Sequence, residues 1–163
     1  YDAYKRFLVV RDPRDILTSF YFSARFSHRK PGQGADEERA ENTDMPPIEE
    51  YVLKQGRKML PRWQTYADMI RRDPDLRLFK YEFIIDNFEE WMNQVVDHTG
   101  LPAKPAMVKA LADAHVADVQ EEEVTKHRRQ IRPGDHKRKL EQSTIDELNA
   151  LYGDIIELFG YEK

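Results

Sequence analysis

The stretch that most constrains this chain is a short apolar run that ends on an arginine and passes directly into a helix. Residues 6–10 read RFLVV, which is typical of a strand buried in a parallel sheet. Asp12 then suits the N-cap of a helix, and Pro13 suits its first turn. Apolar residues recur at helical spacing from there, so the sequence predicts a helix over residues 13–26. A strand that leads straight into a helix favours an α/β layered fold.

The remaining chain reads as mostly helical, with one further strand. Residues 76–81 predict that strand, and Pro47 opens a helical stretch that we expect to break or kink near Gly56–Pro61. Two segments predict loops, a long polar one over residues 27–46 and a basic one over residues 126–139. Further helices are predicted over residues 87–101 with Gly100 as the C-cap, over 104–119, and over 143–161 as one capped amphipathic helix.

Composition sets limits on the kind of protein. The 163 residues suffice for one domain with a hydrophobic core, and 40% hydrophobic with 34% charged residues is typical of a globular chain. The net charge of −4 gives no global reason to expect nucleic acid, so a basic site must be local. The absence of cysteine excludes disulfides, thiolate ligands and cysteine nucleophiles. No apolar run approaches the ~20 residues that span a bilayer, and we expect a cytoplasmic protein.

Arg11 and Ser19 form the first candidate site. Ligands of open parallel sheets bind beyond the carboxyl ends of the strands, where Arg11 stands. A guanidinium there can hold a phosphate through two hydrogen bonds, and Ser19 is close enough along the following helix to join the same anion. In the alternative interpretation, which spacing alone favours, Arg11 pairs with Asp15 and Ser19 is a surface residue of the helix.

The basic segment, residues 126–139, is the second candidate. Seven of its fourteen residues are Lys or Arg although the whole chain is acidic, so it could close over a polyanion. A solvated surface loop explains the same pattern equally well. Nucleic acid is the weaker interpretation, because the segment carries no aromatic residue for base stacking.

Tyr81 and Glu82 form the third candidate, because they end the second predicted strand at the same sheet edge as Arg11. Tyr81 there could meet a base or a substrate ring, although such a tyrosine is more often simply packed. No metal site is predicted, since the histidines do not recur with carboxylates at ligand spacing. We expect all five to be structural or exposed: His28, His98, His115, His127 and His136.

Three segments, in order along the chain, resemble sulfotransferases that use 3′-phosphoadenosine-5′-phosphosulfate (PAPS). VVRDPRDILTSFYF resembles the family's 3′-phosphate-binding segment, with Arg11 and Ser19 at the family's spacing. GRKMLPRWQTYADMI followed by LRLFKYE resembles the middle region, where Tyr81 matches the adenine-contacting tyrosine. RQIRPGDHKRKL resembles the C-terminal cofactor loop, whose matching residues are Arg129, Gly134, Asp135 and Lys137.

The resemblance implies a P-loop NTPase-like parallel sheet with flanking helices, of which this segment is the largely helical C-terminal portion. It implies PAPS as donor, with PAP as the desulfated form, and a small-molecule or carbohydrate acceptor with a hydroxyl or amine group. Arg11, Ser19 and Arg129 would hold the 3′-phosphate, and Tyr81 would contact the adenine. Neither nucleic acid nor a membrane span is implied, and the oligomeric state stays open.

This chain also departs from the family pattern. Gln130 and Ile131 replace the usual Lys-Gly, and His136 stands where tryptophan is usual. No counterpart of the 5′-phosphosulfate loop or of the usual catalytic histidine precedes Arg11, and Tyr1–Arg6 is too short for either. We therefore expect both to lie upstream of a chain that starts within its domain. Two alternatives stay open: a non-catalytic PAP-binding or interaction module with the same fold, and a P-loop nucleotide kinase, which would need a Walker-type loop.

Overall fold

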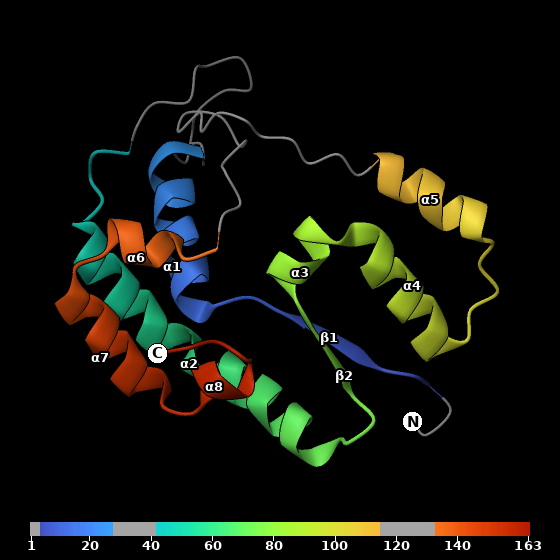
Figure 1. Ribbon diagram of the computed structural model, residues 1–163. Helices are drawn as coiled ribbons and strands as arrows, with labels where there is room; N and C mark the ends of the chain where they lie inside the picture. Colours follow the sequence, from blue (N-terminus) through green and yellow to red (C-terminus); the bar gives the residue numbers. More distant parts are fainter. Residues whose placement is uncertain (1–3, 28–41, 115–132) are drawn as a thin grey trace.

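The computed structural model describes residues 4–27, 42–114 and 133–163 (Figure 1). Helices dominate these ranges, and the two strands belong to one parallel sheet. The mostly helical α/β class expected from the sequence is therefore confirmed. The elements are β1 (Phe7–Val10), α1 (Pro13–Phe22), the π-helical turn η1 (Ser23–Ser27), α2 (Ile48–Arg72), β2 (Arg77–Lys80), α3 (Tyr81–Asp86), α4 (Phe88–Thr99), α5 (Pro105–Ala114), α6 (Asp135–Lys139), α7 (Gln142–Tyr152) and α8 (Ile155–Leu158).

The sheet of the described residues consists of β1 and β2 side by side. The strands run parallel in a register that pairs Phe7 with Arg77 and Val10 with Lys80. A parallel pair needs a crossover connection, which contains α1 and α2 here. The arrangement is compatible with the sheet that the resemblance implies, whereas the P-loop part of that expectation stays a prediction.

The junction between β1 and α1 forms as the sequence predicts. Asp12 Oδ1 accepts a hydrogen bond from the backbone N–H of Arg14 at 2.9 Å, which satisfies one of the free donors at the helix start. Pro13 occupies the first turn, where its missing N–H costs nothing. The helix ends at Phe22 and continues as the turn η1, so the predicted helix over residues 13–26 is confirmed in position.

Of the break or kink predicted near Gly56–Pro61, the break is wrong, because α2 runs as one helix of 25 residues, and the kink stays a prediction. Pro61 is exposed on it and removes one backbone hydrogen bond. The opposite face of α2 packs against α1 and α7 through buried Val52, Gly56, Trp63 and Ala67. Tertiary packing of one face decides whether a long helix persists, and here it outweighs the single lost bond.

Two predictions for the C-terminal third need correction. The expected single helix over residues 143–161 is divided into α7 and α8 at Gly153, and Glu141 at the α7 N-cap makes no capping bond with its side chain. The basic segment is not a loop throughout, because its last five residues form α6. Gly100, by contrast, ends α4 in the left-handed conformation with φ of 68°, which confirms its predicted role as a C-cap.

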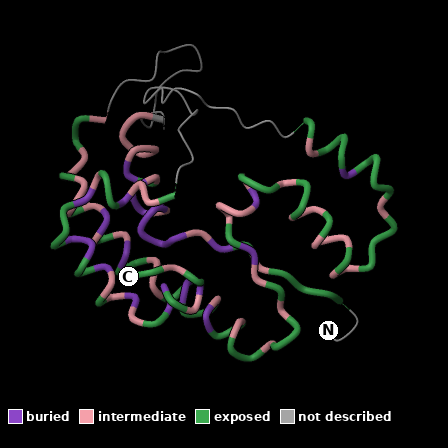
Figure 2. The backbone as a smooth tube through the Cα atoms, viewed as in Figure 1, coloured by how far each residue is buried: buried purple, intermediate pink, exposed green. Residues whose placement is uncertain are grey.

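The hydrophobic core lies where α1, α2, α7 and α8 meet the end of β1. Figure 2 shows buried backbone concentrated there, whereas α4 and α5 are mostly intermediate or exposed. In the ranges that the structure describes, no helix combines the length and the apolar character needed to cross a membrane. The core residues are Val10, Leu17, Val52, Trp63, Ala67, Leu140, Ile145, Leu148, Tyr152, Ile155, Ile156 and Phe159.

Candidate functional site

Arg11 and Tyr81 meet at the carboxyl ends of the two strands. Each is the first residue after its strand, and the register pairs the last strand residues, Val10 and Lys80. The Arg11 guanidinium carbon lies 5.2 Å from the centroid of the Tyr81 ring, within the range of a cation–π contact. Both residues are half-buried. The structure therefore brings together the two predicted site residues that the parallel register places at one sheet edge.

The hydrogen-bonding capacity of Arg11 is not used by the part of the chain that the structure describes. No hydrogen bond or ion pair within the described ranges involves its guanidinium, and its recorded contact is the Tyr81 ring. The alternative pairing of Arg11 with Asp15 is wrong, because Asp15 bonds elsewhere. A half-buried guanidinium with five donors and no carboxylate partner among the described residues is a ready site for an anion.

Asp15 instead holds the end of the basic segment against the start of α1. Its carboxylate accepts hydrogen bonds from the backbone N–H groups of Gly134 and His136, both at 2.9 Å. His136 Nδ1 lies 2.6 Å from Asp15 Oδ1 and carries the shared proton, because an ionised carboxylate can only accept. His136 is therefore structural and buried, in line with the sequence-based expectation for this histidine.

The pKa of Asp15 reflects this environment. Burial would raise the pKa, but the hydrogen bonds from the side chain and backbone of His136, the charge of His136 and the Gly134 N–H outweigh it. The result is a pKa below the usual 3.8. Asp15 is therefore ionised at neutral pH and works as an anchor for α6, not as a proton donor.

Ser19 and Arg129 are the other two residues predicted to bind the cofactor, and the structure describes only Ser19. Ser19 lies on α1 four residues after Asp15 and three before Phe22, whose ring contacts Lys139 of α6. Residues at these spacings share a helix face, so half-buried Ser19 lies on the side of α1 that α6 approaches.

Arg129 lies outside the described residues. Among those that are described, no group of three or more His, Asp or Glu could hold a metal ion.

A family model described as "Sulfotransferase domain" matches residues 2–157. The chain belongs to this sulfotransferase domain family. Membership indicates a transferase whose general reaction is the transfer of a sulfuryl group. Members of the family generally use PAPS as the donor and act on small-molecule acceptors. A search among curated proteins gave no match.

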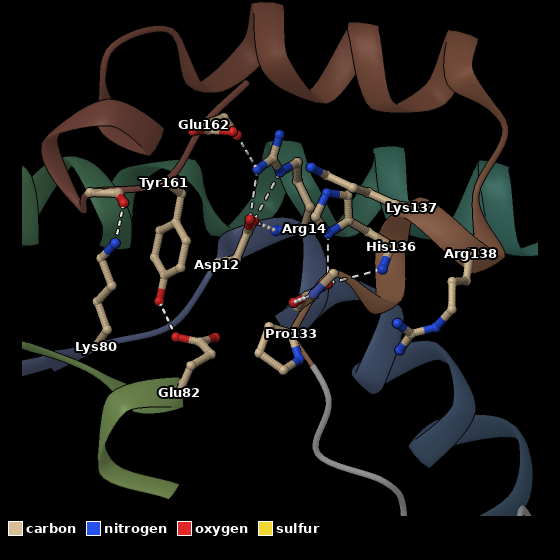
Figure 3. Close-up of a pocket in the computed structure, with 13 residues that line it drawn as sticks. Asp12, Arg14, Lys80, Glu82, Pro133, His136, Lys137, Arg138, Tyr161 and Glu162 are labelled. Carbon is tan, nitrogen blue, oxygen red and sulfur yellow. Dashed lines mark hydrogen bonds and ion pairs between the residues drawn. The ribbon is translucent and has the colours of Figure 1, made fainter. Parts of the chain in front are cut away.

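The sulfotransferase domain also contains a pocket of about 560 Å³ beside the strand ends (Figure 3). Neither Arg11 nor Tyr81 lines it, although their chain neighbours Asp12, Lys80 and Glu82 do. The described residues that line it are Asp12, Arg14, Asp15, Lys80, Glu82, Pro133, Gly134, His136, Lys137, Arg138, Gly160, Tyr161 and Glu162.

Arg14 is the residue of this region that sequence reasoning missed. It is 1% exposed and donates to both carboxylate oxygens of Asp12, to Asn149 Oδ1 at 2.8 Å and to the Glu162 carbonyl at 2.6 Å. The Arg14 guanidinium therefore bonds to groups of the protein itself. Of the two arginines at this junction, Arg11 is the one suited to bind a ligand. The signal in the sequence was weak, because the fragment Asp-Pro-Arg-Asp does not reveal which arginine is buried.

The residues at the strand ends fit the 3′-phosphoadenosine part of PAPS. The Arg11 guanidinium supplies a planar pair of donors for a phosphate, and the Tyr81 ring supplies an aromatic face next to it. Both kinds of group are needed for a phosphorylated nucleoside, and the register places them at one edge.

Proposed function

We propose that this chain supplies the 3′-phosphate and adenine side of the PAPS site in a sulfotransferase that transfers a sulfuryl group to a hydroxyl or amine acceptor. The observation that carries the proposal is the Arg11 guanidinium held against the Tyr81 ring at the strand ends, without a hydrogen-bond partner in the described ranges. Family membership supports the transferase chemistry, and this geometry supports the assignment of the cofactor side.

Each residue has a stated role in this proposal. Arg11 binds the 3′-phosphate through two N–H donors, and Ser19 contributes its hydroxyl from the next turns of α1. Arg129 adds a second guanidinium from the basic segment, which Asp15 fastens beside α1 through Gly134 and His136. The Tyr81 ring stacks on the adenine.

PAPS, when bound, supplies the activated sulfuryl group. The contribution of this chain is to hold the nucleotide end in one orientation, because group transfer depends strongly on the alignment of donor and acceptor. Residues 27–46 are our candidate for contact with the acceptor.

Isothermal titration calorimetry with PAP tests the proposal. Arg11→Ala should weaken PAP binding by about tenfold or more, because a hydrogen bond to a charged group contributes roughly 1.5–3 kcal/mol. Ser19→Ala should weaken it by about threefold to tenfold, because it loses one neutral donor. Arg11→Lys should recover part of the loss, since it restores the charge without the planar pair of donors.

Arg62→Ala is the matched control. Arg62 is exposed on α2, so its loss removes the same charge from the molecule and should leave PAP affinity unchanged. Unchanged affinity in both Arg11→Ala and Ser19→Ala would overturn the site assignment.

The second candidate function is a PAP-binding or interaction module without turnover. The observation in its favour is the pair Gln130 and Ile131, which replaces the Lys-Gly of the family's cofactor loop. Sulfuryl transfer measured with PAPS and a panel of hydroxyl and amine acceptors separates the two functions. PAP binding with no product from any acceptor would favour the module.

A further inference from the structure

The two neighbours of Tyr81 are both bonded to the C-terminal end of the chain. Lys80 Nζ donates to the Gly160 carbonyl, and the Tyr161 hydroxyl donates to Glu82 Oε2 at 2.5 Å (Figure 3). The Lys80 ammonium also lies 5.0 Å from the centroid of the Tyr161 ring. We call residues 160–162 the C-terminal strap.

The two neighbours of Arg11 are tied to the same strap. The Tyr161 hydroxyl lies 3.4 Å from the Val10 carbonyl. Asp12 is bonded to Arg14 by two side-chain N–H groups, and Arg14 donates in turn to the Glu162 carbonyl at 2.6 Å. Arg11 and Tyr81 are therefore each flanked on both sides by residues that the strap holds.

The strand ends need such support. β1 and β2 have four residues each, and an isolated pair of short strands is marginal in water. The ladder ends at Val10 and Lys80, so it does not hold the residues that follow. The Tyr161 hydroxyl donates to Glu82 and lies against the Val10 carbonyl, so it sits between the two ends just where the ladder stops.

Tyr161 is suited to this bridging role by its position and protonation. It is half-buried, and burial followed by the Glu82 carboxylate raises the pKa of its hydroxyl above the usual 10.0, so the hydroxyl is a donor at neutral pH. Gly160 has φ of 81°, and a Cβ there would lie 2.7 Å from Lys80 Cε. The strap thus approaches β2 closely at a position that favours glycine.

We propose that Tyr161 is a positioning residue, which acts through Val10 and Glu82 to hold Arg11 and Tyr81 in the alignment that binds the nucleotide. This inference rests on the proposed function, because it names what fixes the geometry of that same site. Tyr161 itself lines the neighbouring pocket and acts on the nucleotide only through the strand ends.

Tyr161→Phe tests the inference, since it removes the hydroxyl and keeps the ring beside Lys80. We expect PAP affinity to fall by about threefold to tenfold, the usual range for one hydrogen bond. Tyr66→Phe is the matched control: Tyr66 is half-buried on α2 and bonded to neither strand end, so PAP affinity should stay unchanged.

Glu82 variants separate positioning from general destabilisation. Glu82→Gln keeps an oxygen that can accept from Tyr161 and should bind PAP nearly as the parent does, whereas Glu82→Ala removes the shorter contact of the Tyr161 hydroxyl and should lose most of the affinity that Tyr161→Phe loses. The double variant Tyr161→Phe with Glu82→Ala should lose no more affinity than Tyr161→Phe alone, because Tyr161→Phe already removes the bond to Glu82 together with the contact to Val10. Additive losses would overturn the inference.

Hydrogen exchange without ligand gives a readout that does not depend on PAP binding. In Tyr161→Phe, peptides covering residues 8–14 and 78–84 should exchange faster, while a core peptide around Leu148 should not change. If the parent protein fails to bind PAP, the proposed function is refuted. The hydrogen-exchange rates of the two peptides then decide by themselves whether the strap holds the strand ends. Unchanged exchange at both peptides, or unchanged PAP affinity in Tyr161→Phe where the parent binds, would overturn the inference.

Discussion

Asp15 and His136, 121 residues apart in the chain, form a buried pair with Oδ1 and Nδ1 at 2.6 Å. Both side chains are 1% exposed. Two backbone N–H groups, of Gly134 and His136, donate to the same carboxylate. The start of α1 and the end of the basic segment are therefore joined at one side chain, next to the residues proposed to bind the 3′-phosphate.

Asp15→Ala should destabilise the fold strongly. The change leaves three N–H donors without their acceptor, and each buried donor left unsatisfied costs about 1–3 kcal/mol in the free energy of unfolding. Urea unfolding followed by circular dichroism measures it. Asp146→Ala, at an exposed position of α7, is the control and should stay within about 0.5 kcal/mol of the parent. A loss below about 1 kcal/mol for Asp15→Ala would contradict this account of the pair.

Stability should also fall at acid pH through Asp15. Its pKa in the folded state is depressed below 3.8, so the unfolded state binds more protons there. The contribution is fully present above the unfolded pKa near 3.8 and is lost as pH falls through the lower folded pKa. The free energy of unfolding of the parent should thus drop more steeply than that of Asp15→Asn as the pH falls below the unfolded pKa near 3.8. Parallel curves for the two proteins would show that Asp15 carries no such linkage.

Gly56→Ala should destabilise α2 although alanine is the better helix former. The propensity gain is about 1 kcal/mol, but the new Cβ would lie 2.7 Å from the Tyr152 hydroxyl oxygen. That ring cannot move freely, because it is 2% exposed and packs edge-on against Trp63 at 5.0 Å. Overpacking of this kind costs about 1–3 kcal/mol, so the net change should be a lower melting temperature.

Tyr152→Phe provides the control for this prediction. The Tyr152 hydroxyl is buried without a hydrogen-bond partner in the described ranges, so its removal alone should not lower stability. In the double variant the 2.7 Å contact disappears and the 3.0 Å contact with Leu148 Cδ2 remains, so Gly56→Ala should cost clearly less stability than it does in the parent. A double variant as unstable as Gly56→Ala alone would refute the contact as the cause.

Local chemistry made several features predictable. Asp12 as N-cap, Pro13 in the first turn and Gly100 as a left-handed C-cap each follow from the residue's own backbone and side-chain preferences. The edge shared by Arg11 and Tyr81 followed from two short apolar runs and the rule that the carboxyl ends of parallel strands lie together.

At two positions the folded structure differs from what local residue preferences indicate. Pro61 indicated a break in α2, but the buried face of that helix keeps it continuous. The apolar pattern predicts one final helix that includes Gly153, yet the φ of 55° and ψ of −120° at Gly153 end α7 there.

The sequence by itself determined the strand–turn–helix junction and the family resemblance, because both depend on residues close together or on fixed spacings along the chain. Only the tertiary structure decided that Asp15 pairs with His136, that Arg14 is buried while Arg11 has no hydrogen-bond partner in the described ranges, and that the C-terminal strap ties the two strand ends. These pairings join residues 79–148 positions apart, and no local preference selects among the many charged partners that the chain offers.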